Sequence, residues 1–212
     1  FTSFDIEKAR QGVHGFGFYF SPMKAKADGY KGENGRLISA YIFTDRLARI
    51  DSHNLNDVDV ENVLNHFNVP ADEQEWLWHG YDSLADWLKE ESDRVAIQEI
   101  ERRIYRNSDA SVKEILNTFR TKLGIDGIQA GSETILFDNK LVKSADPVTY
   151  DDNGNVIPLS QRFNTGDADI RYSDREQTIT SEDTSLNQTP ATFTNYAFKS
   201  TDRIIDYGGG RY

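Results

Sequence analysis

The segment 15–21, which reads Gly-Phe-Gly-Phe-Tyr-Phe-Ser, constrains the fold more than any other part of the chain. Its alternation of small and aromatic residues predicts a short strand over 17–20, entered across glycines, with Tyr19 at the exposed end. Pro22 and the residues after it suit a short helix with proline in its first turn. That helix would return Tyr30 close to Tyr19, and two facing tyrosines can hold a flat, electron-poor ring by stacking.

A second glycine-bordered segment, 124–138, reads Gly-Ile-Asp-Gly-Ile and then, after two further residues, Gly-Ser-Glu-Thr-Ile-Leu-Phe-Asp. Both halves alternate in the manner of strands, and Glu133 stands at the start of the second one. The sequence therefore predicts two strands, far apart along the chain, whose tyrosine and glutamate side chains meet around one pocket.

These two segments resemble the ADP-ribosyltransferase superfamily, in particular its His-Tyr-Glu class. In that class a Gly-x-Tyr-Phe strand carries one tyrosine, matched by Tyr19, and a second tyrosine eleven residues later is matched by Tyr30. A glutamate that opens a later strand is matched by Glu133. The resemblance implies two catalytic residues, Glu133 and Tyr19, and a set of NAD-binding residues, Tyr19, Tyr30, Gly17, Phe20, Ser21 and Ala27.

The resemblance also implies a fold and an activity. The expected fold class is α+β, an ADP-ribosyltransferase-like split β-sandwich of two mostly antiparallel sheets with an inserted helical block. The expected activity is cleavage of the nicotinamide–ribose bond of NAD, used as substrate without a metal, and transfer of a single ADP-ribose to a target, expected to be a protein. The alternative is a catalytically inactive ADP-ribosyltransferase-like binding module of a phage polyprotein.

The chain departs from the class pattern at several positions. The class has a histidine strand before the tyrosine strand, and we expect its His-Gly-Ser/Thr motif upstream of Phe1. His14 lies only five residues before Tyr19, so it does not fit that motif. Polymerase-like members often have serine where this chain has Ala27. Gly131 stands where arginine- and asparagine-modifying toxins place an acceptor-recognising residue, which leaves the acceptor open.

Helical periodicity dominates the block 57–123. Apolar residues recur three and four positions apart in four stretches, and Ser111 with Glu114 forms a capping box before the last of them. These stripes are more typical of a core than of a cofactor site. The sequence does not decide whether the block covers the cleft or presents a surface to a partner.

The expected domain organisation follows from the motifs and from composition. We expect an ADP-ribosyltransferase-like domain over 1–147, a C-terminal extension over 148–173 like that of phage or mobile-element polyproteins, a linker over 174–194 and the start of another domain over 195–212. The linker is rich in Ser, Thr, Gln, Asp and Glu. The last segment resembles the first motif of methyltransferases, with a glycine-rich terminus as the alternative.

Charge and composition narrow the partners. The net charge of −11 and the absence of any Lys/Arg run give no support to binding of a nucleic-acid backbone. No apolar run reaches membrane-spanning length, so a membrane is not an expected partner. The absence of cysteine leaves the redox compartment open. The oligomeric state and the localisation also stay open, with the host cytoplasm expected if the chain is phage-borne.

Overall fold

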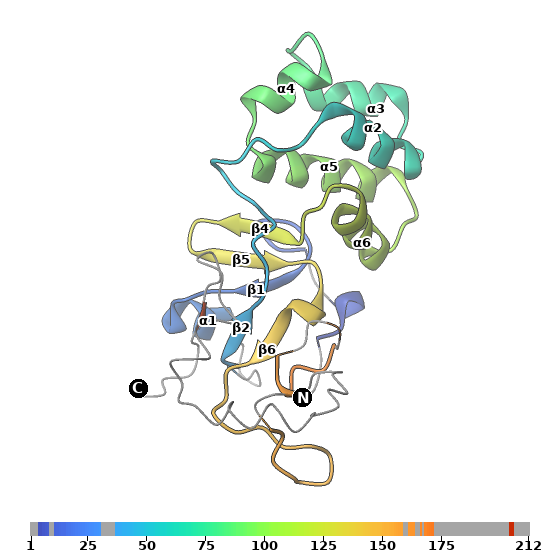
Figure 1. The fold of residues 1–212 in the computed structure, drawn as a ribbon. Coiled ribbons are helices and arrows are strands. Elements are labelled where there is room, and N and C mark those ends of the chain that lie inside the picture. The colour runs from blue at the N-terminus through green and yellow to red at the C-terminus, as the bar shows by residue number, and fades with distance from the viewer. Residues whose placement is uncertain are drawn as a thin grey trace, which may run out of the picture. The chain divides into compact units, whose positions relative to one another are not determined.

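The computed structural model describes residues 4–8, 11–30, 37–158, 161–163, 166 and 168–171, together with the backbone of 204–205 (Figure 1). Over these residues the fold is α+β, with six α-helices and two mostly antiparallel sheets. The chain forms two compact units, and each sheet belongs to one of them. The first unit comprises 1–4, 21–45 and 139–212, and the second comprises 5–20 and 46–138.

The second unit contains a four-stranded sheet in the order β1-β5-β4-β3. These strands are β1 (Phe18–Phe20), β5 (Glu133–Leu136), β4 (Gly127–Ala130) and β3 (Leu47–Ala48). The pairs β1–β5 and β5–β4 are antiparallel, whereas β4–β3 is parallel. The two segments that carried the sequence argument are therefore adjacent strands of one sheet.

The periodic block forms a series of helices in the same unit. They are α2 (Asp57–His66), α3 (Ala71–Glu75), η2 (Trp76–Trp78), α4 (Leu84–Glu90), α5 (Asp93–Asn107) and α6 (Val112–Lys122), and a 3₁₀ turn η1 (Ile6–Lys8) precedes the sheet. Polar side chains accept backbone N–H groups at the start of four helices, from Asn56, Ser83, Ser92 and Ser111. Such caps satisfy amide groups that the helix itself leaves unpaired.

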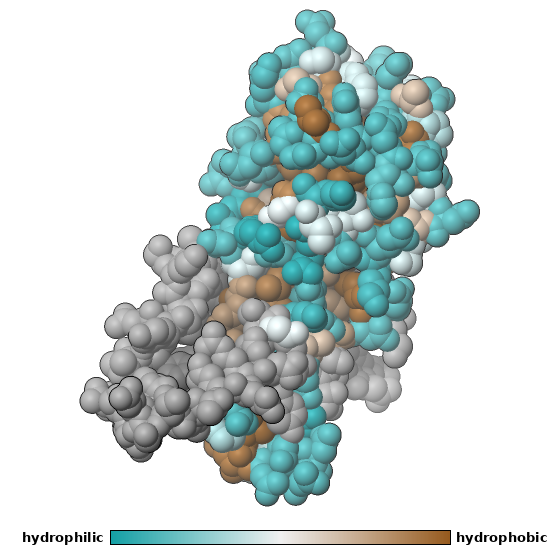
Figure 2. Space-filling view, turned by 45° about the vertical axis from the view of Figure 1, so that its right-hand side comes forward, coloured by the Kyte–Doolittle hydropathy of each residue, from teal (hydrophilic) through white to brown (hydrophobic). Residues whose placement is uncertain are grey.

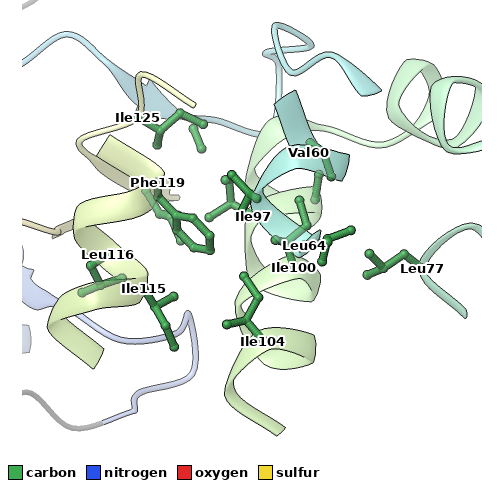
Figure 3. Packing of buried hydrophobic residues seen from close by; sticks show 14 of the residues in the cluster. Val60, Leu64, Leu77, Ile97, Ile100, Ile104, Ile115, Leu116, Phe119 and Ile125 are labelled. Carbon is green, nitrogen blue, oxygen red and sulfur yellow. The ribbon is translucent and has the colours of Figure 1, made fainter. Parts of the chain in front are cut away.

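One face of the sheet is covered by the helices. Ile97, Ile100 and Ile104 of α5 are fully buried, and they share a cluster with Ile128 and Ile135 of the sheet. Figure 3 shows these α5 side chains packed between α2 and α6. Burying an isoleucine of this kind stabilises the fold by about 1.5–3 kcal/mol. The outer surface of the helices is mostly hydrophilic, with hydrophobic side chains confined to patches (Figure 2).

The first unit contains the smaller sheet, in the order β6-β2-β7, with both pairs antiparallel. Its elements are α1 (Lys24–Tyr30), β2 (Ala40–Ile42), η3 (Asn139–Leu141), β6 (Val142–Ser144) and β7 (Ile204–Ile205). After β6, the Asp-Asn-Gly-Asn sequence at 152–155 favours a turn, and the structure has one there. Tyr150 bridges Val156, and the amide of Asp151 donates to the carbonyl of Asn155 at 2.9 Å. The linker at 174–194 lies outside the described residues, as does most of 195–212.

The chain from 40 to 48 is divided between the two sheets. The alternating residues of 36–45 favour one strand that continues toward residue 50, but the structure has two separate strands, β2 and β3. Arg46 begins the second segment of the second unit. Its side chain binds the buried Asp126, and its carbonyl accepts the Asp126 amide at 2.8 Å. This ion pair fixes the chain to the larger sheet after the break.

Candidate active site

Tyr19 and Glu133 lie on the same face of the four-stranded sheet. In the antiparallel pair β1–β5, Tyr19 stands opposite Ile135. Side chains alternate along a strand, so Glu133 shares the face of Ile135 and therefore that of Tyr19. The two residues are thus diagonal neighbours on adjacent strands, within reach of long side chains. Phe20, predicted to line the NAD site, is buried on the opposite face.

The Tyr19 hydroxyl is held by the loop that precedes its strand. It donates to the carbonyl of Gly15 at 2.7 Å and accepts the amide of His14 at 3.1 Å. A Cβ on Gly12 would lie 2.4 Å from the hydroxyl oxygen, so the ring rests directly on that glycine. The tyrosine is therefore fixed at both ends, by the strand at its backbone and by the loop at its hydroxyl.

Glu133 faces His14, a residue that the sequence argument did not place in the site. The Glu133 side chain is 7% exposed, and its Oε2 lies 3.7 Å from Nε2 of His14, whose side chain is 24% exposed. The loop turns back at Gly12 and Gly15, which exchange backbone hydrogen bonds of 3.0 and 3.3 Å. These glycines are the signal in the sequence that could have placed His14 near the strand end.

A second buried carboxyl group supports the same loop from α5. Glu101 is 1% exposed, and both of its carboxylate oxygens lie 3.1 Å from the amide of Phe16, which donates to them. Burial raises the pKa of Glu101 from its ordinary value of 4.5 to about 8, against the opposing effects of the Phe16 amide and of the charge on Arg102. The carboxyl group is thus largely protonated at neutral pH.

Gly17, a predicted NAD-binding residue, has a steric role in the sheet. Its φ is +145°, and a Cβ there would lie 2.5 Å from Cγ2 of Ile135 and 2.8 Å from the carbonyl oxygen of Leu136. Only glycine allows β1 to approach β5 this closely at its entry. The pairing that places Tyr19 beside Glu133 therefore depends on Gly17.

The remaining predicted residues belong to the first unit. Ser21 is buried, and its hydroxyl accepts the amide of Met23 at 3.2 Å at the approach to α1. Ala27 is half-buried on α1. Tyr30 ends α1, and its side chain lies outside the described residues. The pairing of Tyr19 with Tyr30 around a nicotinamide ring therefore stays a prediction.

A separate cluster of charged side chains lies at the start of β4. Asp126 is 2% exposed and binds Arg46 through two bonds of 2.8 and 2.6 Å. Arg120 donates to the same carboxylate at 3.0 Å and also to Asp138. This network joins α6 to both ends of the β4–β5 hairpin, which is a structural role.

Within the part of the chain that the structure describes, no group of three or more His, Asp or Glu side chains could hold a metal ion. Among those same residues, no helix combines the length and the apolar character needed to cross a membrane. No family model matches the chain, and no curated protein or solved structure is significantly similar to it.

Proposed function

We propose that this chain is an NAD-dependent mono-ADP-ribosyltransferase domain with the split β-sandwich of that superfamily, acting as a phage-borne effector on a protein acceptor. One observation carries the proposal. Tyr19 and Glu133, 114 residues apart in the sequence, are diagonal neighbours on one face of one sheet. The motifs that resemble the superfamily thus come from distant segments and meet in the fold.

The proposed reaction breaks the bond between C1′ of the ribose and the ring nitrogen of nicotinamide. Nicotinamide leaves as a neutral molecule with the electron pair of that bond, and positive charge develops on the ribose in an oxocarbenium-like transition state. A nucleophile of the acceptor then forms a bond to C1′ and loses its proton. Every atom is accounted for by NAD and the acceptor.

Glu133 is the residue that would act on the developing charge. Its carboxylate would hydrogen-bond a ribose hydroxyl and stabilise the cation by preorganised electrostatics. It would also receive the proton that the nucleophile releases. Tyr19 would stack on the nicotinamide ring and orient the scissile bond, which is an effect of positioning.

A second candidate function is a catalytically inactive module that binds NAD or a related ligand. The burial of Glu133 favours it, because a carboxylate that is 7% exposed and faces a histidine offers little surface to a ribose. The engaged hydroxyl of Tyr19 favours it too, since that group already bonds within its own loop. Both functions use the same residues and differ in turnover.

The test compares the wild-type protein, extended by any sequence encoded upstream of Phe1, with Glu133→Gln. Label transfer from NAD to lysate proteins and release of nicotinamide are both measured. We expect Glu133→Gln to lower the rate about 10²- to 10³-fold. Glu61→Gln, an exposed carboxylate of α2, is the matched control and should retain full activity.

The outcomes separate the two candidates. Equal transfer by wild type and Glu133→Gln would reject the catalytic assignment. NAD binding by calorimetry without any turnover would establish the inactive module. A wild-type protein that neither binds nor cleaves NAD would exclude the transferase and any module that binds NAD.

A further inference from the structure

Three residues on one face of helix α5 contact the loop that precedes β1, residues 12–17, which we call the glycine loop. Gln98, Glu101 and Tyr105 follow the i, i+3, i+7 spacing that places side chains on one helix face. Each of the three contacts a loop residue: Gln98 contacts His14, Glu101 contacts the backbone of Phe16, and the Tyr105 ring lies 4.8 Å from the Phe16 ring. The helical block therefore reaches the candidate site through this face of α5.

Glu101 fixes the loop backbone. A Cβ on Gly15 would lie 2.6 Å from Oε2 of Glu101, and the φ of Gly15 is +99°. The loop is thus pressed against the carboxyl group at a glycine and bonded to it at the next amide. Since His14 directly precedes Gly15, this contact sets where His14 leaves the loop.

The side chain of Gln98 lies beside the His14 ring and bears on its tautomer. The side-chain nitrogen of Gln98 lies 3.5 Å from Nδ1 of His14. With the Gln98 amide nitrogen as the donor, Nδ1 is the acceptor, and we assign the proton of the neutral ring to Nε2 on that basis. Nε2 is the atom that lies 3.7 Å from the Glu133 carboxylate. The Gln98 amide therefore directs a ring N–H toward Glu133.

We propose that α5 positions a residue of the candidate site: Gln98 and Glu101 hold His14 with its Nε2–H toward Glu133. The expected effect of this arrangement on kcat rests on the proposed function, whereas its effect on the tautomer of His14 does not. A site that depends on α5 also explains why the inserted block packs on the same sheet face as Tyr19 and Glu133.

The experiment uses the same protein as above, labelled with ¹⁵N-histidine, in wild type and in Gln98→Leu. Long-range ¹H–¹⁵N spectra report the tautomer of His14, identified by its loss in His14→Phe, and nicotinamide release gives kcat and KM for NAD. Gln98→Leu should convert the single Nε2–H form to a mixture and lower kcat about 10- to 100-fold with little change in KM. Glu99→Gln, the next residue on α5, is the control and should change neither.

Glu101 is tested by a matched pair. Glu101→Gln keeps an oxygen that accepts the Phe16 amide, so it should show the wild-type tautomer of His14 and the wild-type kcat. Glu101→Leu has no such acceptor, so it should show a mixture of tautomers and a lower kcat. If Glu101→Leu does not fold, Gln98→Leu carries the test.

Two results would overturn the inference. One is a Gln98→Leu variant with the wild-type tautomer. The other is an active enzyme in which Gln98→Leu changes the tautomer but leaves kcat unaltered. If Glu133→Gln proves fully active, so that the proposed function fails, the spectra still decide whether α5 sets the state of His14.

Discussion

The Asp126 cluster and the glycine-loop site lie in the same unit, and both are built around buried carboxyl groups with different partners. Asp126 accepts three bonds from the guanidinium groups of Arg46 and Arg120. Glu101 accepts a backbone amide and is desolvated enough to keep its proton at neutral pH. Glu133 faces the imidazole of His14, with Oε2 3.7 Å from Nε2.

The partners of these carboxyl groups distinguish a cluster that stabilises the fold from one that a ligand could contact. A carboxylate held by two guanidinium groups cannot exchange partners without leaving charges uncompensated, so it stabilises one arrangement of chain. A carboxyl group that faces a single amide or imidazole has one partner to exchange, so a ligand can replace that partner at smaller cost. On this comparison the Arg46–Asp126–Arg120 cluster fixes the sheet, and the glycine loop adjoins the carboxyl groups that the proposed function would use.

The largest effect should come from breaking the arginine cluster. Asp126→Ala leaves Arg46 and Arg120 without their shared carboxylate, and we expect a loss of about 1.5–3 kcal/mol in the free energy of unfolding, measured by urea denaturation. Asp109→Ala, at an exposed carboxylate, is the control and should stay within about 0.5 kcal/mol. A small loss at Asp126 would show that the two clusters do not differ as described.

A pH-dependent effect should come from Glu101. The unfolded carboxyl group ionises near pH 4.5 and the folded one near pH 8, so between these values the folded state binds the additional proton. The free energy of unfolding of the wild type should therefore fall as pH rises, by about 1.4 kcal/mol per pH unit from this group. Glu101→Gln removes that contribution, so the free energy of unfolding of the variant should rise relative to that of the wild type from pH 5 to pH 8.

Urea denaturation of both proteins across this pH range measures the effect. Parallel stability curves would mean that Glu101 titrates normally and that the loop does not desolvate it. The comparison with Asp126 would then lose its basis.

The smallest effect should come from the Tyr19 hydroxyl. Tyr19→Phe removes the bonds to His14 and Gly15 but keeps the ring, and we expect a loss of about 1–2 kcal/mol in the free energy of unfolding. Nicotinamide release should stay within about threefold of wild type, because stacking requires the ring alone. A Tyr19→Phe variant as inactive as Glu133→Gln would instead place the hydroxyl in the chemistry.

Local patterns predicted the elements well where a single periodicity operated. The stripes of 57–123 appear as helices, and Ser111 accepts the amide of Glu114 at 3.2 Å at the predicted capping box. The alternation around Tyr19 and Glu133 appears as β1 and β5. These signals are local because a helix turn or a strand face repeats within a few residues.

Contacts between distant segments were not predictable in the same way. We excluded His14 from the class motif because it lies only five residues before Tyr19. In the structure, the turn between Gly12 and Gly15 brings the His14 ring to Glu133. The contacts of Gln98 and Glu101 with that loop link residues 84 and 85 positions apart. The separation of β2 from β3 likewise depends on the pairing of Arg46 with Asp126, which no local pattern specifies.

The four main helices of 57–123, the strands β1 and β5, and the tyrosine and glutamate of the functional hypothesis were predictable from the chain's own residues. Their meeting on one sheet face, the desolvation of Glu101 and the direction of the His14 ring came only with the tertiary structure. The physical reason is that periodicity and capping act between near neighbours, whereas strand pairing, burial and protonation depend on which remote groups arrive at the same place.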